Sequence, residues 1–177
     1  MRRLFALLLV AAFGIAPAIS RGQIPAAKDV VASSAYTSFD PVARGHEFQI
    51  AVVLKIRDGY HINARKPTLD YLIPTDLKVD LPPGFKASEV SYPDGTLKSF
   101  SFSKTEKLNV YTGTVILRLR VTALPDAPFG AQHIPLKLRY QACSESVCLP
   151  PAKQDVDTAF AVATTGKTAH EEFFKQK

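Results

Sequence analysis

The stretch EFQIAVVLKI, residues 47–56, alternates apolar side chains with other side chains along its length. One set of alternate positions is entirely apolar and the other contains polar residues: Phe48, Ile50, Val52, Leu54 and Ile56 against Glu47, Gln49 and Lys55. Because successive side chains of a strand point to opposite faces of a sheet, this period of two predicts a β-strand with one buried face. Such half-buried strands are typical of antiparallel sheets.

The same alternation recurs over residues 115–121, 133–140 and 156–162. Turn signals separate these segments and leave room for short strands such as residues 77–81; they are Asp58-Gly59, Pro82-Pro83-Gly84, Pro93-Asp94-Gly95 and Pro125-Asp126-Ala127-Pro128. Roughly seven to nine short strands in a chain of this length predict an all-β, antiparallel β-sandwich. The 13 prolines disfavour long helices, and residues 168–176 are the one helix candidate.

The first 20 residues, MRRLFALLLVAAFGIAPAIS, have the pattern of a secretory signal peptide: a basic start, an apolar run and small residues near Ala18. The apolar run is shorter than the roughly 20 residues of a spanning helix, so cleavage after Ala18 or Ser20 is expected over an uncleaved anchor. A lipoprotein signal is disfavoured because no cysteine lies at the cleavage point. We then expect an N-terminal arm over residues 21–38, one sandwich domain over residues 39–163 and a tail over residues 164–177.

The charge pattern argues against nucleic acid as a partner. The formal net charge is +6, and loss of Arg2 and Arg3 with the signal leaves +4. The basic residues alternate with apolar ones along predicted strands, as on a solvated face, and form no basic run with interleaved aromatics. No second apolar stretch approaches spanning length after residue 20. The expected location is periplasmic or otherwise exported, in solution.

Both cysteines lie in YQACSESVCLPP, residues 140–151. In an oxidising compartment, Cys143 and Cys148 are expected to pair by default. Closing so short a loop stabilises a fold by only about 2 kcal/mol, against about 4 for a bridge spanning a domain, so a reactive pair is mildly favoured over a structural one. The polar connection places the sulfurs near the surface. Neither CxxC spacing nor a helix N-terminus is present to lower the thiol pKa, and Glu145 opposes ionisation, so a slow thiol is expected.

Other chemistries find little support. The histidines (His46, His61, His133 and His170) are scattered, the only methionine is Met1, and one C-x4-C spacing does not make a zinc site. There is no Gly-x-Ser-x-Gly motif and no paired carboxylates. No metal, cofactor or small-molecule substrate is therefore expected.

Four motifs together carry a family resemblance. They are YQACSESVCLPP, DGYHINARKP (residues 58–67), YLIPTDLKVDLPPGF (residues 71–85) and YPDG (residues 92–95). From Phe39 to Phe160 the chain resembles the N-terminal periplasmic domain of DsbD-type thiol:disulfide interchange proteins. The resemblance implies an immunoglobulin-like sandwich with an active-site hairpin, acting without a cofactor as a protein-disulfide reductase component, in a context that includes cytochrome c biogenesis.

The resemblance also implies partners and residue roles. A membrane-linked thioredoxin-like donor would reduce the pair, which would pass the electrons to exported thioredoxin-fold oxidoreductases. Cys148 would form the mixed disulfide and Cys143 would resolve it. A cap loop over residues 89–95 would supply Tyr92 as the lid and Glu89 as an acidic neighbour, with His61 and Asn63 near the pair. For His61 an ordinary strand role, and for Tyr92 ordinary packing, stay open.

Two features depart from the family pattern. Four residues separate the cysteines, whereas the best-known members have five. The sequence ends at Lys177 with neither a membrane domain nor a thioredoxin-like domain, so we expect the electron donor to be a separate protein. The alternative hypothesis is a non-catalytic immunoglobulin-like binding module whose disulfide is structural.

Overall fold

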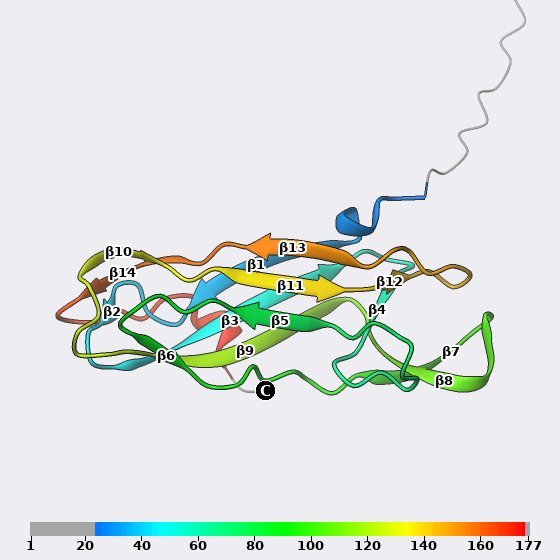
Figure 1. The fold of residues 1–177 in the computed structure, drawn as a ribbon, viewed down its shortest axis with the longest axis horizontal. Helices are drawn as coiled ribbons and strands as arrows, with labels where there is room; N and C mark the ends of the chain where they lie inside the picture. The colour runs from blue at the N-terminus through cyan, green and yellow to red at the C-terminus, as the bar shows by residue number, and fades with distance from the viewer. Residues whose placement is uncertain (1–23, 176–177) are drawn as a thin grey trace, which may run out of the picture.

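The computed structural model describes residues 24–175, which form an elongated molecule built almost entirely of β-strands (Figure 1). The strands are β1 (Val31–Thr37), β2 (Val42–Ala43), β3 (Glu47–Ile56), β4 (His61–Asn63), β5 (Asp76–Val79), β6 (Phe85–Ala87), β7 (Thr96–Phe100), β8 (Ser103–Tyr111), β9 (Thr114–Ala123), β10 (Gly130–His133), β11 (Leu136–Tyr140), β12 (Ala142–Cys143), β13 (Ala152–Val156) and β14 (Ala159–Ala163). Two 3-10 turns, η1 (Ala27–Asp29) and η2 (Glu171–Phe173), flank them. Each turn has three residues, far fewer than the roughly 20 that a membrane-spanning helix needs.

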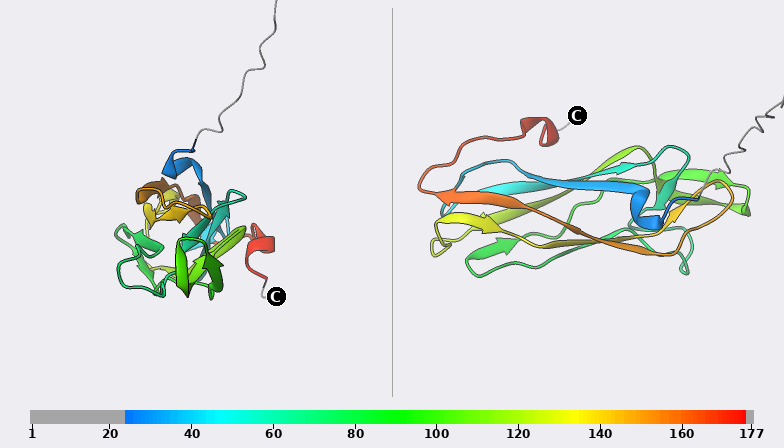
Figure 2. Two further views of the ribbon diagram at one scale, coloured as in Figure 1. Left: turned by 90° about the vertical axis from the view of Figure 1, so that its right-hand side faces the viewer. Right: turned by 90° about the horizontal axis from the view of Figure 1, so that it is seen from above.

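Two sheets form the layers of a sandwich around one hydrophobic core (Figures 1 and 2). One sheet has the strand order β1-β3-β9-β6 and the other β13-β11-β5, with antiparallel neighbours throughout. The core residues come from both layers and include Ile50, Val52, Leu54, Leu117, Leu119, Leu136, Leu138 and Tyr140. The all-β antiparallel sandwich expected from the alternating segments is confirmed, and so is the immunoglobulin-like fold that the family resemblance implies.

Strand β3 has the bounds that its alternation predicts, whereas two other predicted strands are each divided. Between β10 and β11 lie Ile134 and Pro135, and between β13 and β14 lie Asp157 and Thr158. At these points the chain changes sheets, because β10 pairs with β14 while β11 pairs with β13. Proline lacks a backbone N–H, which suits Pro135 to such a break in the ladder.

The segment before residue 39 is more ordered than the expected arm. Every residue of strand β1 is paired with a residue of β3, from Val31 opposite Ile56 to Thr37 opposite Ile50. Its sequence, VASSAYT, is rich in small and polar residues, so the alternation that marks the other strands is weak here. The expected signal peptide falls outside the described residues.

The tail folds back across the outer face of the first sheet (Figure 2). Tyr36, Ala51 and Arg118 stand side by side on β1, β3 and β9. The Phe173 ring stacks on Tyr36 with 4.3 Å between centroids, and the Arg118 guanidinium donates to the Phe173 carbonyl oxygen at 2.9 and 3.1 Å. Ala51 is consequently buried although it points away from the core.

Two smaller sheets lie at opposite ends of the long axis (Figure 1). The sheet β10-β14-β2 is at one end, and the sheet β12-β4-β8-β7, which carries the cysteines, is at the other. A second apolar cluster fills the cysteine end and consists of Leu72, Phe100, Leu108 and Val110, with Leu69 packed against it. The site therefore has its own small core.

Candidate active site: the cysteine hairpin

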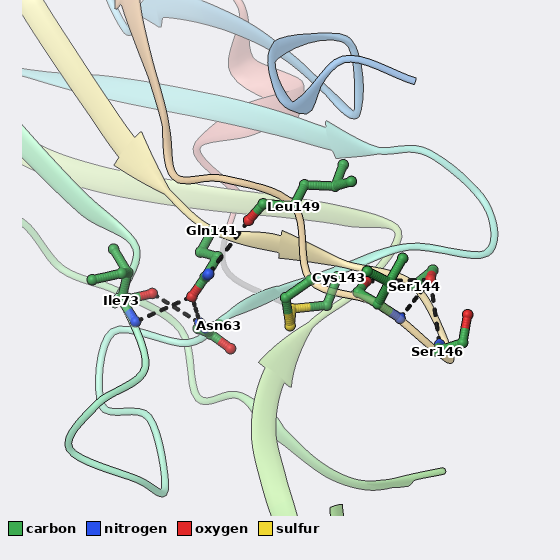
Figure 3. Close-up of a disulfide and its surroundings, with 9 residues drawn as sticks. Asn63, Ile73, Gln141, Cys143, Ser144, Ser146 and Leu149 are labelled. Carbon is green, nitrogen blue, oxygen red and sulfur yellow. Dashed lines mark hydrogen bonds between the residues drawn. A yellow bond between two sulfur atoms is a disulfide. The ribbon is translucent and has the colours of Figure 1, made fainter. Parts of the chain in front are cut away.

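Cys143 and Cys148 form a disulfide across a tight hairpin at the end of β12 (Figure 3). The Leu149 N–H donates to the Ala142 carbonyl, and the Ser144 N–H donates to the Val147 carbonyl, both at 2.8 Å. The Ser144 hydroxyl also accepts hydrogen bonds from the N–H groups of residues 146 and 147. Serine commonly closes turns in this way, and backbone pairing thus holds the hairpin in addition to the disulfide.

The two sulfur-bearing residues differ in their access to solvent. Cys143 is 1% exposed, whereas Cys148 is partly exposed. Thiol–disulfide exchange requires an attacking thiolate to reach one sulfur of the bond. The geometry therefore admits attack at Cys148 and hinders attack at Cys143.

His61 lies directly opposite Cys143 in the pairing of β4 with β12. Its side chain is buried, and its ring stacks on Phe100 at 3.9 Å between centroids. Burial, together with the nearby positive charge of Lys98, lowers the pKa of His61 to about 4. At neutral pH the imidazole is therefore uncharged, with one nitrogen as donor and the other as acceptor.

Asn63 supports the base of the cysteine hairpin through hydrogen bonds (Figure 3). Its fully buried side chain donates from Nδ2 to the Ile73 carbonyl at 2.9 Å and to the Gln141 side-chain oxygen at 3.4 Å. Gln141 in turn donates to the Leu149 carbonyl, which follows the second cysteine. This chain of hydrogen bonds connects β4 to both arms of the hairpin.

The end of the β7–β8 hairpin, residues 100–103, lies against the cysteine hairpin, and we call it the aromatic tip. Phe100 is buried in the small cluster, and Phe102 stacks on it at 5.4 Å while staying 40% exposed. The Ser101 hydroxyl donates to the Glu145 carbonyl at 2.6 Å. The aromatic tip thus covers the His61 side of the pair.

A cavity of about 190 Å³ adjoins the aromatic tip and the cysteine turn. Its lining combines two cationic and two acidic side chains, Arg57, Lys98, Asp58 and Glu145, with Tyr60 and Phe100 among the aromatic ones. Charges of both signs therefore lie beside the aromatic tip and the cysteine turn.

Comparison with known proteins shows the family to which the chain belongs. The family described as "Thiol:disulfide interchange protein DsbD, N-terminal" matches residues 27–159. The chain belongs to this family. No curated protein matches the chain in a sequence search.

Two solved structures with this kind of domain are similar to the chain. The DsbD N-terminal domain from Neisseria meningitidis, in the reduced form, is 20% identical with a TM-score of 0.46, over 82% of this chain and 94% of that one. The N-terminal periplasmic domain of ScsB from Proteus mirabilis is 12% identical with a TM-score of 0.48, over 71% of this chain and 45% of that one.

Two residues that we expected in the DsbD-type cap loop make their contacts elsewhere. The Tyr92 hydroxyl accepts a hydrogen bond from the Leu77 N–H of β5 at 2.9 Å, and its ring lies under the Arg65 guanidinium at 5.1 Å. Burial raises the pKa of Tyr92. Glu89 is exposed beside Ser88, and within residues 24–175 no hydrogen bond or ring contact joins Tyr92 or Glu89 to either cysteine. The described contacts to the cysteine turn come instead from the aromatic tip.

Sequence reasoning missed the aromatic tip and Gln141. The signal for the tip was SFSFS, residues 99–103, where two phenylalanines alternate with serines. That pattern resembles an ordinary strand, and only strand pairing brings Ser101 beside Glu145, 44 positions later. Gln141 was visible in the YQAC motif, but its bond to Asn63 depends on β4 lying next to β12, and its bond to Leu149 depends on the return of the chain in the cysteine hairpin.

Proposed function

We propose that this domain relays reducing equivalents by thiol–disulfide exchange through Cys148 and Cys143, between a thioredoxin-fold donor and exported oxidoreductases. Membership of the DsbD N-terminal family supports exchange with thioredoxin-like partners. The observation that carries the division of roles is the unequal exposure of the two cysteines, since Cys148 is accessible and Cys143 is buried.

In the reducing half of the cycle, a partner thiolate attacks the Cys148 sulfur. A new disulfide forms between the partner and Cys148, the Cys143–Cys148 bond breaks, and its electron pair leaves on Cys143. The partner's second thiolate then attacks the partner's own sulfur and releases Cys148. The domain has gained two electrons and two protons, and the partner dithiol has become a disulfide.

In the other half, the Cys148 thiolate attacks the disulfide of an oxidised acceptor. Cys143 then attacks the Cys148 sulfur, restores the domain's own disulfide and releases the acceptor as a dithiol. Only the cysteines of the two proteins exchange electrons, so no small-molecule cofactor is needed. The aromatic tip would limit attack by unrelated thiols, and an exported location would keep the resting pair oxidised.

The test has two parts. The first is a redox titration of the purified domain against glutathione and dithiothreitol buffers. The second uses a Cys143→Ala variant whose Cys148 has been converted to a mixed disulfide with thionitrobenzoate by reaction with dithiobis(nitrobenzoate). This variant is mixed with a reduced thioredoxin that retains only its nucleophilic cysteine. We expect a covalent complex with Cys143→Ala. The matched Cys148→Ala variant, activated in the same way after denaturation and refolding, should react at least tenfold more slowly because Cys143 is buried.

A potential near those of exported reductants, with rapid complex formation, supports the relay. A potential below about −300 mV, which is typical of structural disulfides, together with no covalent complex would contradict it. That result would favour a binding module with a structural disulfide.

A further inference from the structure

His61 is a buried ionisable side chain to which disulfide exchange by itself assigns no role. Its side chain is 3% exposed, and among residues 24–175 its Nε2 atom has no hydrogen-bond partner. A buried polar atom without a partner is costly to a fold and calls for an explanation. Two of its neighbours belong to the redox site: Cys143, which is opposite it in the strand pair, and Phe100, on which its ring stacks.

The strand register places His61 directly across from the buried Cys143. His61 and Cys143 are directly opposed in the antiparallel β4–β12 pair. Opposed side chains in such a pair stand on the same face of the sheet, with Cβ atoms about 4.5–5.5 Å apart. The imidazole also stacks on the buried Phe100 ring, which fixes its orientation and limits access of water.

In the disulfide state, the charged groups around His61 do not stabilise the protonated form of its imidazole. Lys98 of β7 disfavours the imidazolium, and it shares the adjoining cavity with Arg57 and Asp58 of the β3–β4 turn and Glu145 of the cysteine turn. These are two cationic and two anionic side chains, and among them Lys98 acts on the imidazole. A new negative charge on Cys143 would therefore be the strongest local influence on the ring.

We propose that His61 is the proton partner of Cys143, stabilising the thiolate that forms at this buried sulfur when the disulfide opens. The proposal rests on the exchange function above. When the Cys143–Cys148 bond breaks, the electron pair stays on the Cys143 sulfur, where little water is available to solvate it. The imidazole N–H donates a hydrogen bond to the sulfur, one proton enters from water, and the thiolate and the imidazole share that proton. When Cys143 later attacks Cys148, the proton returns to water.

The first test uses the unaltered protein. The imidazole carbon and proton resonances of the histidines are followed by NMR from pH 3 to pH 9 in the disulfide form and in the dithiol form. We expect the titration of His61 to move upward by at least one pH unit on reduction, a tenfold gain in proton affinity. The exposed His46 and His133 serve as internal controls whose titrations should not move. An unchanged His61 titration would overturn the proposal.

The second test measures the thiol in a single-cysteine background. In Cys148→Ala, the Cys143 thiolate is titrated by absorbance near 240 nm, with and without His61→Phe, which keeps a ring for stacking on Phe100. His133→Phe, an exposed position, is the matched control. We expect His61→Phe to reduce the thiolate fraction at a given pH at least tenfold, and His133→Phe to leave it unchanged. Equal titrations in the His61→Phe and His61 proteins would overturn the proposal.

A His61→Gln variant separates hydrogen bonding from proton sharing. Glutamine can donate a hydrogen bond but holds no proton at these pH values. A thiolate fraction between those of His61 and His61→Phe supports proton sharing, and a fraction equal to that of His61 contradicts it. Neither test involves a partner protein. If the trapping experiment fails but the His61 titration moves on reduction, only the relay is rejected. If trapping succeeds but the His61 titration does not move, only the role of His61 is rejected.

Discussion

The Ser101 hydroxyl donates a 2.6 Å hydrogen bond to the Glu145 carbonyl oxygen, and this bond ties the aromatic tip to the turn between the two cysteines. Two sets of hydrogen bonds therefore hold the turn. One is its own backbone pairing between residues 142 and 149, and the other is the bond from Ser101 in the β7–β8 hairpin. Because a single hydrogen bond contributes only about 1 kcal/mol, the buried Phe100 ring, which stacks on His61, also holds the tip in place.

Truncating the exposed aromatic ring should open the pair to small thiols. In Phe102→Ala, the ring that stacks on Phe100 over His61 is lost, and we expect dithiothreitol to reduce the disulfide several-fold faster. Stopped-flow measurement of the reduction rate checks this. Leu97→Ala removes an exposed apolar side chain from β7 in the same hairpin and serves as the control. A rate equal to that of the unaltered protein would show that the tip does not shield the sulfurs.

Reduction of the disulfide should leave the domain folded. The loop is short, so the entropic gain from closing it is only about 2 kcal/mol, and the hairpin keeps its backbone hydrogen bonds at residues 142, 144, 147 and 149. Urea unfolding with and without a reductant measures the difference. Loss of the folded state on reduction would instead indicate a structural disulfide.

Acid should destabilise the fold through His61. Its pKa is about 4 in the folded protein and near 6.5 in the unfolded chain, so the unfolded state binds more protons between these values. Stability should therefore fall as the pH drops from about 6.5 to about 4, by on the order of 2 kcal/mol from this residue. Urea unfolding at pH 4 and pH 7 tests the prediction. His61→Phe should show a smaller loss over the same interval, and an equal loss would rule out His61 as the source.

Removing the Phe173 ring should weaken the cover that the tail provides for the first sheet. The stack on Tyr36 is lost and Ala51 becomes partly exposed, so Phe173→Ala should lower the free energy of unfolding by about 1 kcal/mol or somewhat more. Phe174→Ala is the matched control, since its neighbouring ring makes no stacking contact within the described part of the chain. Thermal unfolding of both variants measures the difference. A larger loss of stability in Phe173→Ala than in Phe174→Ala indicates that the tail packs on the sheet, and equal stabilities would show that the tail contributes nothing.

The amino-acid sequence by itself determined the class of fold and the cysteine pair. The alternation in residues 47–56 identified β3 to the residue, because a period of two is a local property of an extended chain. The spacing of Cys143 and Cys148 and the motif around them identified the hairpin and its family for a similar reason, since both lie within one short segment.

The tertiary structure decided what lies around that pair. Strand register set His61 against Cys143, and the sheet order β12-β4-β8-β7 brought Ser101 to Glu145. The weakly alternating β1 is a strand because β3 offers it an edge, and Ala51 is buried because the tail returns over it. These contacts join residues separated by 13 to more than 100 positions, so they depend on packing and register, which no local pattern in the chain encodes.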